Sequence, residues 1–202
     1  IAPLLFILMA MFLPAQERWS YSAEEMEKTS INDKEVRRLN ENVRFVKMDK
    51  VILTDNASQY ITEDVLHLNG NTMMISGLDT ITCDSMVYWS KLDSGYAMGN
   101  VHYMQPEKYR RLTTDIFHYW QTEGYRGSSF ITHGYTRVIE SNQLITANEI
   151  KYDDDLQLMM LSVNASVEDP TRGIFGDEMK IQYADSLVEI IRVDKNAFAY
   201  ND

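Results

Sequence analysis

The sequence predicts an elongated all-β protein built from stacked repeats. Three observations favour this class: a repeat of about thirty residues over residues 40–200, alternation of apolar and polar residues with period two, and Gly, Asn or Asp at the ends of short apolar runs. A fixed period of this size is typical of architectures in which each unit buries its apolar face only against its neighbours.

The repeat consists of two half-motifs that alternate along the chain. The first is Asn followed by a short β-prone run, and it begins at Asn42, Asn71, Asn100, Asn164 and Asn196. The second is an acid or amide, then an apolar residue, then Tyr, and it begins at Asp55, Asp84, Asp115, Asn148 and Asp177, in steps of 29, 31, 33 and 29 residues. A missing copy of the first half-motif falls near residues 134–138, so we expect the stack to be irregular there.

The runs between these motifs are predicted to be strands. Residues 65–68, 73–75 and 101–103 alternate or are continuously apolar, and no clean helical stripe occurs after residue 40. We expect roughly a dozen or more short strands of about four to eight residues. Gly70, Asn71, Gly99 and Asn100 tolerate positive φ, and we interpret them as corners between two arms of each repeat.

Alternation also predicts which side chains face the interior, because neighbouring residues of a strand point to opposite faces. In the second half-motif the apolar residue and the Tyr share a face in most copies. The predicted inward set is Val43, Phe45, Leu53, Ala57, Leu66, Leu68, Met73, Ile75, Met86, Tyr88, Met98, Val101, Tyr103, Phe117, Tyr119, Ile150, Tyr152, Met179, Ile181 and Tyr183.

Composition and charge limit the function classes. The chain has 202 residues, of which 45% are hydrophobic, so a core is possible and global disorder is not expected. The formal net charge is -11, without a long basic run. A single-sign acidic surface repels phosphate backbones, so nucleic acid is not an expected partner.

The N-terminal region divides into two segments ahead of the repeat domain at residues 40–202. Residues 1–15 carry no charge and resemble the apolar region of an export signal, with cleavage plausible after Ala15. An uncleaved anchor and a buried helix are the alternatives. Residues 16–39 are polar, and we interpret them as a linker with a short helical turn around residues 23–28.

Side chains that carry chemistry do not form a recognisable active site. Cys83 lies in an apolar run and is predicted to be a buried small hydrophobe. His67, His102, His118 and His133 lack the spacing of metal ligands, and the acidic run 153–155 is predicted to be a hairpin turn rather than a calcium loop. Glu140, Glu149, Glu168 and Asp169 are the carboxylates that a glycosidase pair would need. We expect no catalytic residues, no metal and no cofactor.

The alternating motifs resemble the OstA/LptA-like family of lipopolysaccharide transport proteins. The resemblance rests on Gly99-Asn-Val101 alternating with Asp84-Ser-Met-Val-Tyr88 and Asp115-Ile-Phe-His-Tyr119, and it covers about residues 40–200. It implies an open, elongated β-jellyroll, shaped like a folded taco, of about five stacked repeats of ~30 residues. It also implies an apolar interior that holds acyl chains, and end-to-end joining of edge strands with itself or with other jellyroll proteins of the same transport system.

The sequence therefore predicts a non-enzymatic periplasmic protein that binds and transports lipopolysaccharide or a related glycolipid, with the inward set as its lipid groove. Methionine in the repeats suits an irregular apolar ligand. The alternatives are a structural, solenoid-like assembly module with a closed core, the N-terminal periplasmic domain of a larger outer-membrane assembly protein, and a glycan-active β-helix enzyme.

Overall fold

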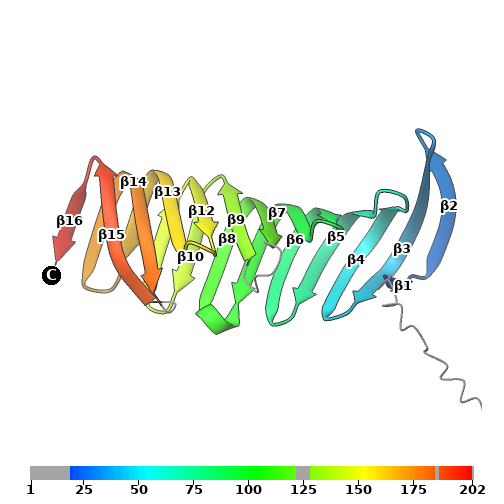
Figure 1. The fold of residues 1–202 in the computed structure, drawn as a ribbon, viewed down its shortest axis with the longest axis horizontal. Coiled ribbons are helices and arrows are strands. Elements are labelled where there is room, and N and C mark those ends of the chain that lie inside the picture. Colours follow the sequence, from blue (N-terminus) through cyan, green and yellow to red (C-terminus); the bar gives the residue numbers. More distant parts are fainter. Residues whose placement is uncertain (1–18, 122–127, 185–186, 202) are drawn as a thin grey trace, which may run out of the picture.

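The computed structural model describes residues 19–121, 128–184 and 187–201. Within these ranges, sixteen strands form one antiparallel sheet, with a single short 3-10 helix, η1 (Pro106–Lys108). The strands lie across a long axis, and the first and last of them are at opposite ends of the molecule (Figure 1). Their bounds are β1 (Ser20–Ser22), β2 (Glu25–Ile31), β3 (Lys34–Lys47), β4 (Lys50–Tyr60), β5 (Val65–Ser76), β6 (Asp79–Trp89), β7 (Ser94–Gln105), β8 (Arg110–Gln121), β9 (Ser128–His133), β10 (Thr136–Glu140), β11 (Gln143–Ala147), β12 (Glu149–Asp153), β13 (Leu158–Glu168), β14 (Arg172–Ala184), β15 (Leu187–Lys195) and β16 (Phe198–Asn201).

The sheet folds over itself into two layers. The first half of β8 pairs with β10, and its second half pairs with β9. In the same way, the two halves of β13 pair with β12 and β11. Layer 1 comprises segments 43–54, 72–83, 101–114, 136–147 and 165–175, and layer 2 comprises 56–69, 85–98, 116–121, 128–133, 149–162 and 178–184. The predicted all-β jellyroll is therefore confirmed.

The alternation of hairpins between the two layers explains the sequence period. Each repeat contributes one hairpin to layer 1 and one to layer 2, so two passes across the roll consume about thirty residues at the ~3.3 Å rise of a strand. The strands are longer than the sequence predicted: β3 has 14 residues and β7 has 12. The reason is that most of the half-motifs lie inside strands, where the sheet bends, and not in turns between strands.

The bend runs along one long edge, which we call the hinge edge. The pairing register shifts there in successive ladders, for example between Asn69 and Thr72 and between Met98 and Val101. Gly70 has φ +81° and Asn71 φ 40°, and Gly99 and Asn100 repeat this pattern with 73° and 46°. These are β-bulges, which bend and twist a strand without ending it.

The two half-motifs contact each other at the hinge edge. The Asn71 side chain donates a hydrogen bond to Asp55 Oδ2 at 2.9 Å, and Asn100 donates to Asp84 Oδ2 at the same distance. A Cβ on Gly99 would lie 2.3 Å from Asp84 Oδ2, so only glycine fits beside this carboxylate. The repeat is thus a ladder of acid–amide pairs between neighbouring strands.

The bulges also decide which residues face inward, and they correct four predictions. In β4 the buried positions change from Ile52 and Thr54 to Ala57 and Gln59 across the Asp bulge, so Leu53 faces outward and is 37% exposed. In the Gly-Asn strands the alternation continues in phase. Leu68 is followed on the same face by Met74, so Met73 and Ile75 point outward, and Ala97 takes the inward place predicted for Met98.

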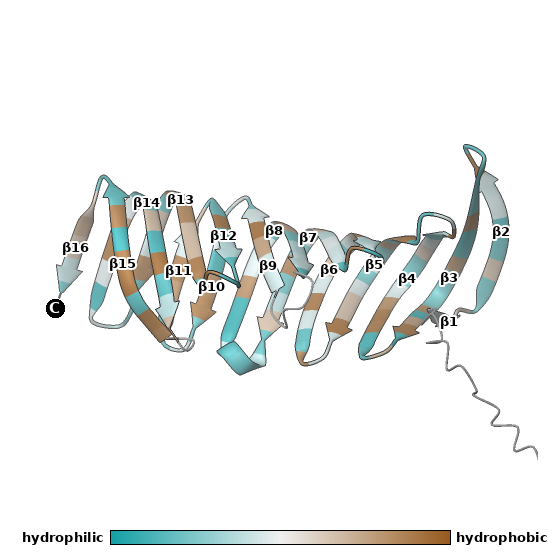
Figure 2. Cartoon of the chain, in the orientation of Figure 1, coloured by the Kyte–Doolittle hydropathy of each residue, from teal (hydrophilic) through white to brown (hydrophobic). Residues whose placement is uncertain are grey.

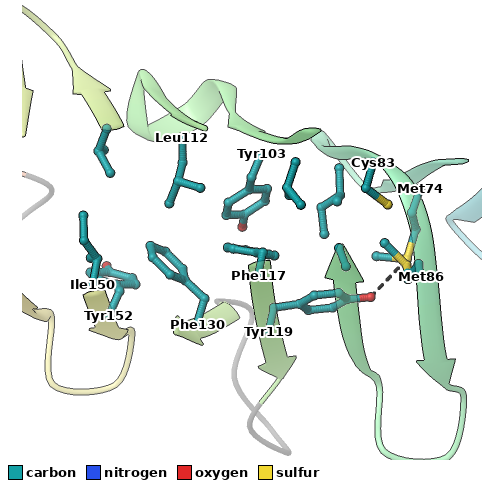
Figure 3. Close-up of a cluster of buried hydrophobic side chains, with 14 of the residues drawn as sticks. Met74, Cys83, Met86, Tyr103, Leu112, Phe117, Tyr119, Phe130, Ile150 and Tyr152 are labelled. Carbon is teal, nitrogen blue, oxygen red and sulfur yellow. Dashed lines mark hydrogen bonds between the residues drawn. The ribbon is translucent and has the colours of Figure 1, made fainter. Parts of the chain in front are cut away.

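The core lies between the two layers. Apolar and polar residues alternate along the strands (Figure 2). In the central part Tyr103 and Leu112 of layer 1 face Phe117, Phe130 and Tyr152 of layer 2 (Figure 3). Burial of such large side chains contributes about 1.5–3 kcal/mol each, so this interface is the main source of stability.

The fourth copy of the repeat is irregular, as the sequence predicted. A continuous strand is replaced by β9 and β10, which Gly134 (φ +90°) separates. The hydroxyl of Thr136 lies 2.9 Å from that of Thr114 and 2.8 Å from that of Thr132. These buried hydroxyls hold the bend where the Gly-Asn pair is missing.

The N-terminal interpretation needs a correction. The predicted linker contains β1, β2 and the start of β3, and residues 25–28 are strand, not a helical turn. Polar side chains predominate in β1 and β2 because both strands lie at the exposed end of the sheet. The predicted export signal at residues 1–15 lies outside the described residues. In the described part of the chain, no helix combines the length and hydrophobicity that a membrane span requires.

Candidate functional site

The interior of the roll is the candidate site, because it gathers most of the side chains predicted to face inward. Sixteen of the twenty residues of that set belong to the buried core cluster, and the other four are Leu53, Met73, Ile75 and Met98. The sequence missed other members of the core, among them Trp19, Leu39, Ile52, Met74, Phe130 and Met159. Period-two counting does not find Ile52 or Met74, because the sequence does not show whether the alternation changes phase at a bulge.

The interior is filled by the protein's own side chains. Phe45, Ile52, Phe117 and Tyr152 have no exposed surface. The rings of Tyr103 and Phe117, which belong to opposite layers, are 5.0 Å apart between centroids. At these distances aromatic side chains are in contact, so an acyl chain can enter only where the two layers separate.

The edge opposite the hinge is where the layers meet through polar groups, and we call it the mouth edge. Hairpin turns of both layers line it. Lys50, in the first turn of layer 1, forms an ion pair with Asp93 of layer 2, and Tyr88 donates a hydrogen bond of 2.8 Å to the same carboxylate. Nearby, Trp19 Nε1 donates to Ser90 Oγ at 2.8 Å.

A second ion pair crosses the mouth edge farther along. Lys108 of η1 pairs with Asp154 of layer 2 and donates a hydrogen bond of 3.0 Å to the Tyr152 hydroxyl. The side chains of Lys108 and Asp154 are only 19% and 13% exposed. Partial burial makes this pair less sensitive to screening than a surface ion pair. We call the Lys50–Asp93 and Lys108–Asp154 pairs the clasps.

A third polar contact near the mouth edge is buried: an ion pair within layer 1, which a tyrosine of layer 2 joins. Arg110 Nη2 lies 3.1 Å from Glu140 Oε1, and Tyr183 of layer 2 donates to Glu140 Oε2 at 3.0 Å. Burial alone would lower the pKa of Arg110, but the charge and hydrogen bond of Glu140, together with Tyr183 and Tyr152, outweigh it and the pKa is raised. Burial, opposed by the charge of Arg110, raises the pKa of Tyr183, so its hydroxyl stays protonated as a donor to Glu140. The guanidinium also lies 4.3 Å from the Tyr152 ring centroid.

A cleft of about 520 Å³ opens on the mouth edge, with Lys50 and Lys108 of the two clasps in its lining. Its deep residues are apolar or aromatic: Met74, Ile81, Tyr103 and Tyr119. Its rim is polar and includes Asp49, Lys50, Asp79, Glu107 and Lys108. This volume is in the range of small-ligand pockets, so the cleft is the accessible part of the candidate site.

Both ends of the sheet expose edge strands. β2 pairs with β3, and β16 pairs with β14, through one side of each in the described part of the chain. Every residue of β16 is exposed, including Phe198 (61%) and Tyr200 (39%). At the other end Met26 of β2 is 58% exposed. Such edges are templates for pairing with another chain.

The carboxylates considered for catalysis do not converge. Glu140 is paired with Arg110, Glu149 lies 3.3 Å from the His133 imidazole, and Asp169 bonds Arg172 and Thr171. Glu168 accepts from Ser166 at 3.0 Å. Residues 154–157 form the predicted hairpin turn. Among the residues that the structure describes, no group of three or more His, Cys, Asp or Glu side chains is placed to hold a metal.

Comparison with known proteins assigns no family to this chain, so its assignment depends on the sequence motifs and the fold. No protein-family description and no curated protein matches the chain. Among solved structures, the chain is similar to LptH of Pseudomonas aeruginosa, described as the LptA-homologous periplasmic component of the lipopolysaccharide transport device. The two share 8% identity, the match covers 92% of this chain and 96% of that one, and the TM-score is 0.27. A likeness this distant does not by itself assign a function.

Proposed function

We propose that this protein is a non-enzymatic periplasmic module of lipopolysaccharide transport, which carries acyl chains between its two layers. The observation that carries the proposal is one antiparallel sheet folded around an apolar interior, built from the acid–amide repeat that resembles the OstA/LptA-like family. An acyl chain gains about 0.8 kcal/mol for each methylene that it buries, so an apolar interior of this length is a suitable environment.

The sheet ends support a role as a bridge. β2 at one end and β16 at the other are exposed, and neither pairs on its outer side with any residue that the structure describes. A further jellyroll module, or a second copy of the chain, would extend the sheet by strand addition and continue the apolar interior. The carried molecule would then pass between modules without crossing water.

The filled interior favours one alternative, a structural assembly module in which the core never opens. The measurement that separates the two is mass spectrometry of lipids that co-purify with the protein from a Gram-negative periplasm. A transport module is expected to retain species of the lipid A type. Their absence after overexpression would favour the structural module.

A variant pair checks that retained lipid lies inside the roll. Met86→Asp places a charge in the interior, where Met86 is 1% exposed, and Met104→Asp places the same charge on the outer face, where Met104 is 44% exposed. We expect the inner variant to lose lipid or to unfold, and the outer variant to behave like the unmodified protein. Equal lipid retention by both variants would contradict an interior site.

A further inference from the structure

The charges around the mouth cleft determine which amphiphile it accepts. Two of its lysines are already engaged, since Lys50 pairs with Asp93 and Lys108 with Asp154. Three rim carboxylates remain, on Asp49, Asp79 and Glu107, and none of them forms an ion pair with a described residue. The rim therefore has a surplus of negative charge, in a chain whose net charge is also -11.

The floor of the cleft contains a buried donor with a poor acceptor. Tyr119 is 4% exposed, and its hydroxyl donates to the thioether sulfur of Met74 at 3.0 Å (Figure 3). Sulfur is a weak acceptor, whereas the neighbouring Tyr103 hydroxyl has a carboxylate partner, Asp79, at 2.8 Å. A ligand oxygen in the cleft would satisfy the Tyr119 hydroxyl better than Met74 does.

We propose that the mouth cleft binds a single acyl chain whose head carries an ammonium group, with the acyl carbonyl at Tyr119 and the ammonium at Asp79 and Glu107. This inference goes beyond the proposed function, because it assigns the cleft a ligand whose head differs in charge from that of lipopolysaccharide. A polyanionic head is disfavoured at this rim, because the uncompensated carboxylates repel it. The chain itself lies on Met74 and Ile81, the aliphatic side chains at the bottom of the cleft.

The test is calorimetric titration of the full chain with four amphiphiles of equal chain length, below their micellar concentrations. Dodecanoylcholine carries both the carbonyl and the cation, dodecyltrimethylammonium only the cation, dodecyl maltoside no charge, and dodecyl sulfate a negative charge. We expect one site per chain and affinities that fall in that order. Binding of the sulfate as tightly as the cations, or no saturable binding by any of the four, would overturn the proposal.

Three variants assign the contacts. Asp79→Asn/Glu107→Gln is expected to weaken both cations about tenfold and to leave the maltoside unchanged. Tyr119→Phe should remove the advantage of dodecanoylcholine over dodecyltrimethylammonium and nothing else. Asp153→Asn/Asp155→Asn is the control, which removes the same number of charges at a layer 2 hairpin. If the control weakens the cations as much as the double variant does, a diffuse surface charge explains the binding and the proposal fails.

These outcomes are distinct from those of the proposed function. Recovery of lipid A-type species together with a preference for the sulfate would retain the transport role and reject the ammonium head. The expected order of affinities, without recovery of any such species, would retain the cleft and reject lipopolysaccharide as the cargo.

Discussion

The two long edges of the roll are closed by different means. At the hinge edge the chain itself passes from one layer to the other, and the pairs Asp55–Asn71 and Asp84–Asn100 hold two of its bulges. At the mouth edge the layers are separate segments, joined by clasps between residues 43 and 46 positions apart in the chain. The hinge is thus a covalent bend that polar side chains shape, whereas the mouth is a noncovalent contact that can open.

This difference assigns separate tasks to the two edges. Opening at the hinge would break backbone pairing in every strand, which costs far more than the loss of one ion pair. Opening at the mouth breaks only side-chain contacts and exposes the cleft. Four predictions test the comparison, and they run from the largest expected effect to the smallest.

The largest effect is expected for the buried contact near the mouth edge. Glu140→Ala leaves the Arg110 guanidinium, which is 1% exposed, without its counterion, and should lower the free energy of unfolding by about 3–5 kcal/mol. Urea unfolding measures it. Arg110→Met/Glu140→Leu is the control, since removing both charges avoids the unpaired charge and should recover most of the loss. A cost below about 1 kcal/mol for the single variant would show that Arg110 finds another partner.

The second prediction compares two glycines with positive φ, one at each edge. Gly77 lies in a mouth turn, and the nearest atom to an added Cβ is 3.8 Å away. Gly77→Ala should therefore lower the free energy of unfolding only by the ~1–2 kcal/mol that alanine loses at positive φ. Gly99→Ala should cost about 1–3 kcal/mol more, because Asp84 must move and loses its bond to Asn100. Thermal and urea unfolding measure both. Equal costs would mean that the hinge tolerates displacement of the carboxylate.

Salt concentration should distinguish the hydrogen bonds of the hinge from the ion pairs of the mouth by its effect on the free energy of unfolding. Asn100→Gly keeps the positive φ permissible and removes one hydrogen bond, so it should cost about 0.5–1.5 kcal/mol at any ionic strength. Lys108→Met removes a clasp, and its cost of about 1 kcal/mol should shrink in part as salt rises from about 0.05 to about 0.5 M, since screening weakens ion pairs. Partial burial should make this decrease smaller than for an exposed ion pair. Unfolding free energies across a salt series test this. A parallel salt dependence in both variants would remove the distinction.

The smallest effect concerns Cys83, which lies next to the hinge bulge at Asp84. It is 5% exposed, as the sequence predicted for a buried hydrophobe, and burial raises the pKa of its thiol from 9.0 to about 12. A raised pKa in the folded state means that this contribution to stability is complete below pH 9 and is lost between pH 9 and 12. Thiol labelling at neutral pH should therefore be slow and proceed through opening of the hinge.

Labelling rates then show which edge opens. We expect Lys108→Met to leave the rate for Cys83 unchanged, because the mouth can loosen without exposing the hinge. Gly99→Ala should accelerate labelling, since it disturbs the bulge beside the thiol. Acceleration by the clasp variant instead would show that the two edges open together.

The hinge could be predicted from the sequence to a large extent. Its residues are close in the chain, Asp84 and Asn100 recur with the period, and the bulges need residues that tolerate positive φ. The sequence misplaced the faces of Leu53, Met73, Ile75 and Met98, because a bulge inside a strand and a turn between strands have the same local signature. No count along the chain reveals whether the alternation changes phase at such a point.

The mouth could not be predicted in the same way. Lys50, Lys108 and Arg110 carry no motif, and the clasp lysines find their partners in the opposite layer. Tyr119 belongs to the repeat, but its Met74 partner also comes from the opposite layer. Asp79, Asp93 and Asp154 were ordinary acidic residues in an acidic chain.

The sequence by itself determined the all-β class, the thirty-residue unit and most of the apolar interior, because period-two alternation and the acid–amide repeat are local properties of the chain. The tertiary structure decided which edge is continuous and which is closed by clasps, and where the cleft lies. Those features depend on how two distant segments are superposed when the sheet folds over, and this superposition is set by packing across the core rather than by any neighbour in sequence.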